Sequence, residues 1–528
     1  MDKKEEATSS TSSTSSNKGV MLASLVIILA VFMAILDTSI VNVAIPKMMA
    51  VFGVNQSQIQ WVVTAYALVV GALVPVTGYL GDRFGYKKIF LVALSIFTVG
   101  SALCGLAWSN GSMIIFRIVQ GLGGGALMPV SMTMMLSMFP PERRGRAMGM
   151  FGLSIMFAPA IGPTLSGYIT EYSNWRLIFT INVPFGIIDF LLAWYLLKDF
   201  NKSVNQRLDI WGLITSSIGM ATLLYGVGIV PDKGLYDTEV ITFVSIGIIS
   251  LIAFIIIELN VKEPLLDLRL LKNFTYTLSL IISSIATVIL MGSMFLIPVF
   301  LQNISHLSSV QTGLVLLPQA IFAGIMMPIS GALFDKIGGR ILAVTGMLLT
   351  SFSLYLTASL DATTSNSTLI FWMVLRSVGT GLMMMPIQTS GMNAIPLNKI
   401  SRGTALNNTV RQVSSSFGIA WLTLLLTNRQ TYHAALNRDS LNQMSTQVMV
   451  NLQEITNGFI GLGQSASQAH ASAVSYMAGQ VQLRSVVSGM DDVFMVTAGL
   501  ALVGGFLSLF IKRTKLNKGG EKPHVIAE

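Results

Sequence analysis

Long apolar stretches separated by short polar connections dominate this chain. Each stretch holds about 18–26 residues, which is the length that an α-helix needs to cross a hydrocarbon core of about 30 Å. The pattern predicts about fourteen such helices, six in a first group, two in a linker and six in a second group. The expected positions are 20–45, 59–80, 87–108, 112–138, 145–170, 176–197, 210–229, 240–258, 276–301, 310–332, 340–359, 367–392, 404–427 and 489–511.

The same pattern divides the chain into five parts and predicts an all-α integral membrane protein. Residues 1–19 are charged and rich in Ser and Thr, so we expect a disordered tail. The connection 428–488 is the longest, and its partly helix-like spacing predicts a small amphipathic cap, with disorder as the alternative. The parts are the tail 1–19, a six-helix bundle 20–198, two linker helices 199–262, a second six-helix bundle 263–511 and a tail 512–528.

Basic residues fix the expected orientation. They gather in alternate short loops, for example at Lys87, Arg143, Lys198 and Arg402, whereas the other loops are nearly bare of them. The positive-inside rule then places these loops and both tails in the cytoplasm.

Only 11% of the residues are charged, against about 25% in soluble domains, so lipid must surround most of the chain. The net charge of +9 therefore does not indicate nucleic acid, and we expect a bacterial cytoplasmic membrane protein.

Three ionisable side chains inside the predicted spanning helices are the candidates for proton coupling: Asp37, Arg117 and Asp189. Such a side chain costs about 2.5–3.5 kcal/mol on insertion scales, so its presence indicates function. Asp37 must face a water-filled cavity or carry a proton, and both conditions suit a residue that exchanges protons. Arg117 must pair or reach water. Asp189 is a candidate second proton or cation site, or alternatively a paired residue near the cytoplasmic mouth.

The loop at 78–88, between the second and third predicted helices, reads GYLGDRFGYKK. Glycines there permit close helix approach and a tight turn, and Asp82 can cap the next helix and pair with basic neighbours. A degenerate copy at 331–340 occupies the corresponding place in the second half. This loop resembles the signature loop of the major facilitator superfamily. The gating residues that the resemblance implies are Gly78, Asp82, Arg83, Gly85 and Asp335.

The fifth predicted helix contains APAIGPTLSG at 158–167. Pro159 and Pro163 remove backbone donors and bend the helix, while Gly162 and Gly167 give it a smooth contact face. The segment resembles the motif that marks antiporters within that superfamily; simple packing between membrane helices is the alternative. The resemblance also associates the arginine of the fourth helix, Arg117, with proton coupling, the alternative being a structural arginine that binds carbonyl groups.

Four segments in this order, 34–46, 61–66, 174–184 and 401–412, resemble the EmrB/QacA-type drug:proton antiporters with fourteen helices. The resemblance implies two six-helix bundles that alternate access, and proton-driven export of amphiphilic or cationic toxic compounds without a cofactor. The long connection before the last helix is similar to the EmrB-like branch and implies a possible membrane-fusion adaptor as partner. An exporter of a metabolite, siderophore or lipid is the alternative.

Polar, aromatic and methionine side chains near the middle of the predicted helices are candidates for the substrate cavity, since such surfaces adapt to varied apolar ligands. Packing or contact with lipid is the alternative for each of them. The candidates are Asn42, Trp61, Tyr66, Gln120, Phe157, Asn182 and Met384.

The sequence argues against an enzyme and against ATP-driven pumping. Its four histidines are scattered, so they form no pattern typical of metal ligands, and no Gly-x-x-x-x-Gly-Lys-Ser/Thr phosphate loop occurs. The single cysteine, Cys104, lies within an apolar stretch and permits no intramolecular disulfide.

Overall fold

The computed structural model describes residues 5–199, 209–261, 264–361, 364–442 and 446–512. The described chain is almost wholly helical, as a bilayer demands, because a helix satisfies its backbone hydrogen bonds within itself. Helices α1 to α8 form the first half. They are α1 (Glu5–Phe52), α2 (Gln56–Leu73), α3 (Thr77–Phe84), α4 (Tyr86–Gly105), α5 (Asn110–Met138), α6 (Arg144–Tyr172), α7 (Leu177–Thr180) and α8 (Asn182–Leu196).

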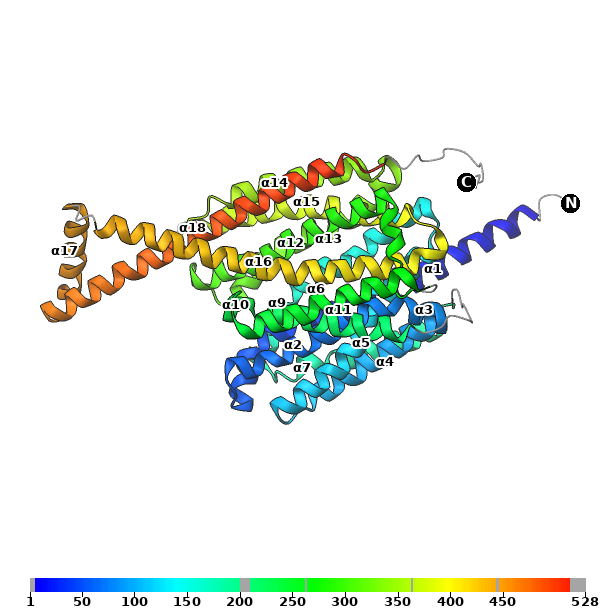
Figure 1. Ribbon diagram of the computed structural model, residues 1–528, viewed down its shortest axis with the longest axis horizontal. Helices are drawn as coiled ribbons and strands as arrows, with labels where there is room; N and C mark the ends of the chain where they lie inside the picture. The colour runs from blue at the N-terminus through cyan, green and yellow to red at the C-terminus, as the bar shows by residue number, and fades with distance from the viewer. Residues whose placement is uncertain (1–4, 200–208, 262–263, 362–363, 443–445, 513–528) are drawn as a thin grey trace.

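The linker and the second half follow. Their helices are α9 (Ile210–Gly228), α10 (Val230–Lys233), α11 (Thr238–Asn260), α12 (Phe274–Asn303), α13 (Ser309–Ile337), α14 (Gly339–Thr357), α15 (Asn366–Asn393), α16 (Ile400–Asn442), α17 (Thr446–Gly461) and α18 (Ala466–Ser508). Thirteen spans in the described residues are long and apolar enough to cross a membrane. Helix α16 is more polar but runs lengthwise among them (Figure 1), and it supplies the predicted fourteenth.

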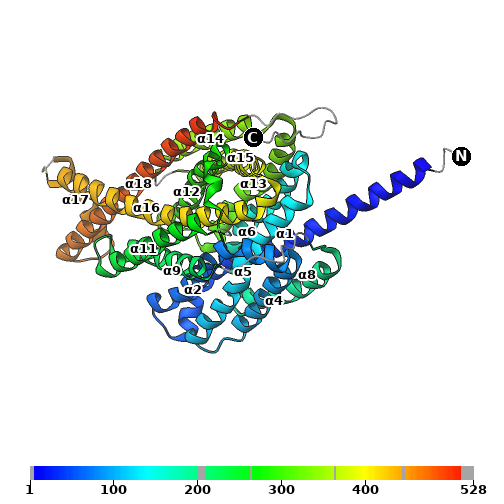
Figure 2. The same ribbon diagram turned by 45° about the vertical axis from the view of Figure 1, so that its right-hand side comes forward.

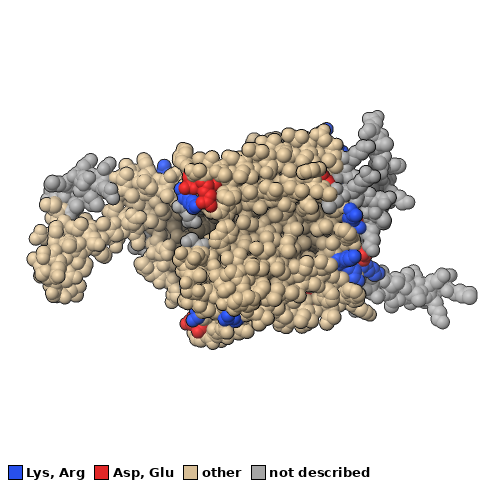
Figure 3. All heavy atoms as spheres, turned by 60° about the horizontal axis from the view of Figure 1, so that its bottom comes forward, with Lys and Arg blue, Asp and Glu red and all other residues tan. Residues whose placement is uncertain are grey.

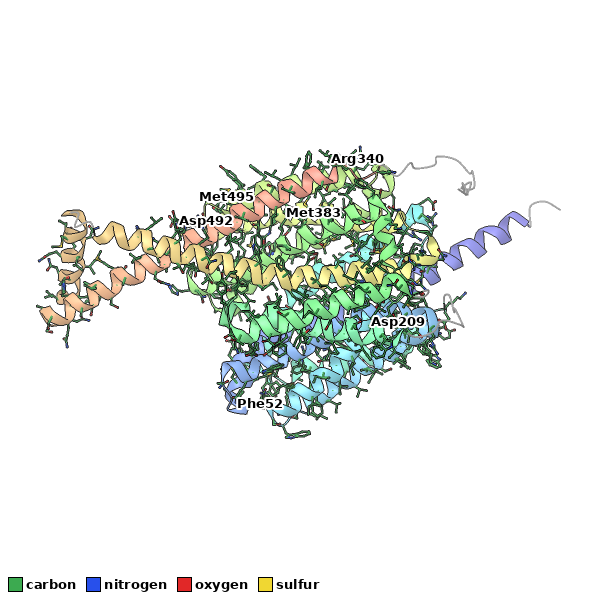
Figure 4. All side chains as sticks on the ribbon, viewed as in Figure 1. Phe52, Asp209, Arg340, Met383, Asp492 and Met495 are labelled. Atoms are coloured by element: carbon green, nitrogen blue, oxygen red, sulfur yellow. The ribbon has the colours of Figure 1, made fainter. Side chains whose placement is uncertain are left out.

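The helices lie side by side along one axis, with α2, α4 and α5 on one side of the molecule and α14, α15 and α18 on the other (Figures 1 and 2). On the face drawn in Figure 3 the long flank carries almost no charge, and Lys, Arg, Asp and Glu gather toward the two ends. Figure 4 shows Arg340 and Asp209 at one end, and Phe52 and Asp492 at the other. This belt of uncharged surface suits a surrounding bilayer.

One expectation about the segments outside the spanning helices was wrong, and a second was correct only in part. Helix α1 already begins at Glu5, so most of the segment expected to be a disordered tail continues the first helix. Adding residues to an existing helix avoids the cost of nucleation, which explains how a polar segment can extend it. The described residues of the connection 428–488 are helical, as predicted, but they form no separate cap. They are extensions of α16 and α18 with α17 at the tip, and these project from the bundle (Figure 1).

An ion cluster fastens this projecting hairpin at its base. Asp492 of α18 accepts hydrogen bonds from Arg429 Nε at 2.6 Å and pairs with His433 Nε2 at 2.7 Å, both on α16. One turn further out, Asn437 donates to Ser485 Oγ at 3.0 Å. The two helices therefore leave the bundle as one packed pair.

The linker helices pack on the flank of the bundle. The ring of Trp61 in α2 stacks on Tyr225 of α9, with ring centroids 5.6 Å apart, and Gly71 of α2 lies against Leu224. Helix α9 also contacts α16 of the second half. The linker pair thus lies beside the line where the two halves meet.

Helix α6 remains one continuous helix through both of its prolines, and α1 supplies the donor that one of them lacks. Pro163 has no N–H for the carbonyl oxygen of Pro159, and Ser39 Oγ of α1 donates to that oxygen at 3.0 Å. Gly162 faces Ser39, and a Cβ at this position would collide with it. The proline and glycine pattern of this helix is therefore used for close packing on α1.

Two aspartates join the halves at the end of the molecule where α1 begins. Asp82, at the end of α3, accepts a hydrogen bond from Ser401 Oγ in the first turn of α16 at 2.8 Å. Asp335, at the end of α13, accepts from the backbone N–H groups of Gly145 and Arg146 in the first turn of α6, both at 3.1 Å. Each half thus holds the start of a helix in the other half.

We call these two contacts, Asp82 with Ser401 and Asp335 with the start of α6, the latches. The surroundings of the Asp82 latch differ from expectation in one respect. Asp82 does not cap the next helix; besides Ser401 it binds the hydroxyl of Tyr86 at 2.8 Å, because Gly85 itself ends α3 and begins α4 with φ +91°. Arg83 turns back to bind the hydroxyl of Tyr79. Gly78 lies against Ser401 and Ala405, which brings α3 close to α16.

Candidate functional site: a buried ion pair behind the central cavity

Asp37 and Arg117 form an ion pair deep inside the first half. Arg117 Nη1 of α5 lies 2.5 Å from Asp37 Oδ2 of α1, and the two side chains are 0–1% exposed. From the sequence we expected Asp37 either to face a water-filled cavity or to carry a proton. The structure shows a third arrangement, in which a cation from another helix neutralises the carboxylate. Breaking such a pair in a dry interior leaves an uncompensated charge, which is costly.

Amide side chains complete the shell of Asp37. Gln120 Nε2 donates to Asp37 Oδ1 at 2.8 Å, and Asn182 Nδ2 donates to the same oxygen at 3.2 Å. Gln120 also accepts from Arg117 Nη1 at 2.6 Å and donates to Ser101 Oγ at 2.7 Å. These bonds join Asp37, Arg117, Gln120 and Asn182 into one hydrogen-bonded network across α1, α5 and α8.

The remaining faces of Arg117 touch α2. Its Nε donates to the carbonyl oxygen of Val62 at 3.2 Å, and its guanidinium carbon lies 4.1 Å from the ring centre of Tyr66. Gly124 leaves room for the Tyr66 hydroxyl, since a Cβ there would collide with it. Tyr66 therefore forms a wall with the ion pair behind it.

The other side of Tyr66 faces a cavity of about 140 Å³ between the two halves. The cavity lies between α1, α2, α5 and α16, and its wall is largely apolar. The lining residues are Ala34, Ile35, Thr38, Tyr66, Val70, Val74, Gly124, Gly125, Met128, Pro129, Asn408, Arg411 and Gln412. A second void of about 10 Å³, lined in part by Met384, lies within the second half and shares Arg411 with the first.

The predicted cavity residues therefore occupy different places. Of these, Tyr66 lines the larger cavity and Met384 the smaller void, while Gln120 and Asn182 belong to the shell of Asp37. Asn42 is exposed, one helical turn beyond Thr38 on the same face of α1.

Two predicted cavity residues lie elsewhere. Trp61 is 42% exposed and stacks on the linker helix α9, because α9 covers that face of α2. Phe157 of α6 packs against Gly324 of α13, where the absent side chain leaves space for its ring. Both positions are packing contacts between helices, and neither lines a described cavity.

Asp189 of α8 is separate from the ion pair. It is fully buried, and neither carboxyl oxygen has a hydrogen-bond partner among the described residues. The alternative to a proton site, a paired residue near the cytoplasmic mouth, is therefore not observed among the described residues. Burial of a carboxylate without a partner is costly unless the group is neutral.

Sequence reasoning missed Arg411 of α16, which borders both cavities. A signal was present, because Arg411 lies within an arginine-, asparagine- and glutamine-containing segment in the middle of a spanning helix. It also missed Ser101, whose small hydroxyl at a close helix contact is difficult to distinguish from packing.

Comparisons with curated proteins agree with this architecture. The chain is 39% identical over 510 residues to "Uncharacterized MFS-type transporter YhcA" of Bacillus subtilis, covering 96% of each chain. It is 30% identical over 501 residues to "Multidrug export protein EmrB" of Haemophilus influenzae, covering 93% of this chain and 94% of that one. With "Lincomycin resistance protein LmrB" of Bacillus subtilis it shares 34% over 403 residues, 76% of this chain and 84% of the relative.

Solved structures share the fold. The proton:xylose symporter XylE superposes with a TM-score of 0.61 at 12% identity, covering 94% of this chain and 97% of that one. The human organic anion transporter MFSD10 superposes with a TM-score of 0.58 at 14% identity, covering 93% and 99%. Residues 27–419 match the sequence profile described as Major Facilitator Superfamily. With its many apolar spans and full-length transporter relatives, the chain is a multi-pass plasma-membrane protein that belongs to the Major Facilitator Superfamily.

Proposed function

We propose that this protein exports amphiphilic toxic compounds from the cell in exchange for protons. The observation that carries the proposal is the buried Asp37–Arg117 pair, whose arginine packs on Tyr66, a residue that lines a cavity between the two halves. Relatives named for multidrug export and lincomycin resistance support the substrate class.

Protonation of Asp37 would remove the negative charge that holds Arg117, Gln120 and Asn182 in place. Arg117 would then be a buried cation without a counter-charge and would have to move or gain water. Because the guanidinium of Arg117 packs on Tyr66, its movement would also displace this ring, which lines the cavity. Proton binding and substrate binding are thereby coupled through one aromatic ring.

The latches at Asp82 and Asp335 supply the second element of the cycle. They close the end that the positive-inside rule assigns to the cytoplasm. Alternating access then requires these contacts to break while the opposite end closes, as the two bundles rock about the cavity. Each inward proton contributes about 2.3 kcal/mol per 100 mV of membrane potential, and no cofactor enters the cycle.

Two further assignments belong to the same proposal. Asp189, buried without a partner, is a candidate second proton site. The hairpin of α16, α17 and α18 projects far enough from the bundle to serve as a contact for a membrane-fusion adaptor (Figure 1).

The test compares Asp37→Asn with the wild type in proteoliposomes under an imposed pH gradient. Asn keeps the size of the side chain and one accepting oxygen but cannot carry the proton, so we expect the variant to fold and bind dye while losing gradient-driven transport. Glu171→Gln, which removes an exposed carboxylate at the end of α6, is the matched control and should transport normally.

Gradient-driven transport at the wild-type rate by folded Asp37→Asn protein would refute the role of Asp37. Size-exclusion profiles and dye binding of the purified variant distinguish this outcome from misfolding.

A further inference from the structure

Arg411 is a cation without a counter-charge at the meeting point of the two halves. It lies on α16 and borders both the 140 Å³ cavity and the smaller void. Among the described residues it forms no ion pair, and its Nη2 makes one recorded contact, 2.8 Å to the sulfur of Met128 on α5. A thioether is a weak acceptor, so most of the hydrogen-bonding capacity of this guanidinium is unused.

Neither cavity offers a negative charge. No Asp or Glu occurs among the residues that line them. The acid nearest in sequence to the cavity wall, Asp37, is 1% exposed and already binds Arg117, Gln120 and Asn182. A cationic ligand in this cavity would therefore meet a like charge and find no described carboxylate.

The other groups around Arg411 suit an anion with an apolar body. Asn408 and Gln412, four residues apart on one face of α16, line the same cavity as Arg411. The amide nitrogen of Asn408 donates to the carbonyl oxygen of Thr404 at 3.0 Å, and its amide oxygen is buried without a partner. Rotating the amide by half a turn would direct its N–H₂ group toward an anionic ligand. Opposite them, Ala34, Ile35 and Val70 form an apolar wall.

We infer that the cavity selects amphiphiles that carry a carboxylate or similar single negative charge, with Arg411 as the group that binds the charge. The inference rests on the proposed export function and narrows its substrate class from amphiphilic compounds in general to anionic amphiphiles, in place of the cationic compounds that the sequence also allowed.

The contact with Met128 links this binding to the opening of the cavity. Met128 belongs to the first half and Arg411 to the second, so separating the halves around the cavity would free the guanidinium. The present cavity is smaller than the roughly 300 Å³ typical of drug sites, and such an opening would also supply the volume. An arriving carboxylate then replaces a sulfur atom with a bidentate partner.

The test measures binding of three dansyl probes to the purified full chain in phosphatidylcholine nanodiscs. The probes share one undecyl chain and end in a carboxylate, its methyl ester or an amine. We expect the wild type to bind the carboxylate roughly 10- to 100-fold more tightly than the amine, as a charge-assisted hydrogen bond implies. Equal or tighter binding of the amine overturns the inference without any variant.

Variants then assign the preference to one residue. Arg411→Gln should weaken carboxylate binding roughly 10-fold or more and leave ester binding unchanged, while Arg411→Lys should retain the preference in part. Arg376→Gln, which removes another buried arginine of the same half that lines neither cavity, is the control and should keep the preference. An unchanged preference in Arg411→Gln overturns the assignment.

Two further measurements test whether the site binds a bilayer lipid and whether the protein exports at all. If anionic phosphatidylglycerol in the nanodisc displaces the carboxylate probe, the site belongs to a bilayer lipid and the inference is overturned. Gradient-driven transport of the neutral ester by wild-type proteoliposomes tests the export function separately: its absence refutes the proposed function, whereas a missing carboxylate preference with ester transport intact refutes only the inference about substrate charge.

Discussion

The fourth spanning helix of each half carries one buried arginine, and the surroundings of the two arginines differ. Arg117 of α5 binds Asp37, Gln120 and the Val62 carbonyl and packs on Tyr66. Arg376 of α15 has one recorded partner, Gln319 Oε1 at 2.9 Å, and its Nη1 is buried without any.

This difference separates the tasks of two similar halves. The first half contains a buried carboxylate paired with an arginine, and the ring of Tyr66 connects this pair to the cavity. In the second half the described arginines near the middle of the bundle, Arg376 and Arg411, have no acidic partner. The two halves therefore share a helix arrangement, but among the described residues they differ in whether the central arginine is neutralised by a carboxylate.

Arg117→Gln is expected to have the largest effect. It leaves Asp37 buried without its cation, and the free energy of unfolding should fall by about 3–5 kcal/mol. The double variant Asp37→Asn/Arg117→Gln should recover most of this loss, because no buried charge remains, yet it should not restore coupled export. Thermal midpoints in detergent measure the changes in stability, and transport assays measure export. Equal losses of stability in the single and double variants would contradict the ion pair between Asp37 and Arg117.

Asp82→Asn and Asp335→Asn test whether both halves contribute to the latch. Each weakens charge-assisted hydrogen bonds across the halves, so the population open at this end should rise roughly 10-fold. Spin labels at the exposed residues Lys88 and Lys336 report the distance between the halves. Glu142→Gln, an exposed carboxylate at the same end, is the control, and unchanged distances in both aspartate variants would show that the latches do not hold this end closed.

Ser39→Ala should have a smaller effect, about 1 kcal/mol, because it removes the donor that satisfies the Pro159 carbonyl. In a Pro163→Ala background the helix regains its own N–H for that carbonyl, so the same substitution should cost almost nothing. Unfolding measurements on the four proteins form a double-mutant cycle. Equal costs in both backgrounds would mean that Ser39 acts through packing alone.

Arg376→Gln should have the smallest effect, about 1 kcal/mol or less, because it leaves no carboxylate unpaired. Export should persist. Thermal midpoints and gradient-driven transport, measured beside Arg117→Gln, give the contrast directly. If Arg376→Gln lowered the thermal midpoint and the transport rate as much as Arg117→Gln does, the second half would also depend on its buried charge.

The positions of the spanning helices could be predicted because a bilayer makes length and hydrophobicity a local criterion. The sixth span shows the limit of that criterion: it is one apolar stretch, but the structure divides it into α7 and α8 at Ile181. Helix α16 shows the opposite case, since its polar residues reduce its hydropathy although it runs within the bundle.

For the candidate site, the sequence identified single residues but not the contacts between them. Asp37 and Arg117 were found because a charge inside a spanning helix is unusual. Their pairing could not be derived, since the two lie 80 positions apart and the contact depends on which faces of α1 and α5 meet. Trp61 illustrates the same point, because its aromatic character is equally compatible with a cavity and with the linker helix that it contacts.

The sequence by itself determined the membrane class, the helix positions and the residues at which charge lies at depth, because each follows from a local cost of placing a side chain in lipid. Tertiary structure alone decided which charges neutralise one another and which remain open to a ligand. Between helices in a membrane the choice of contact faces depends on shape and small residues rather than on hydrophobicity. The pairing of Asp37 and the isolation of Arg411 are consequences of that choice.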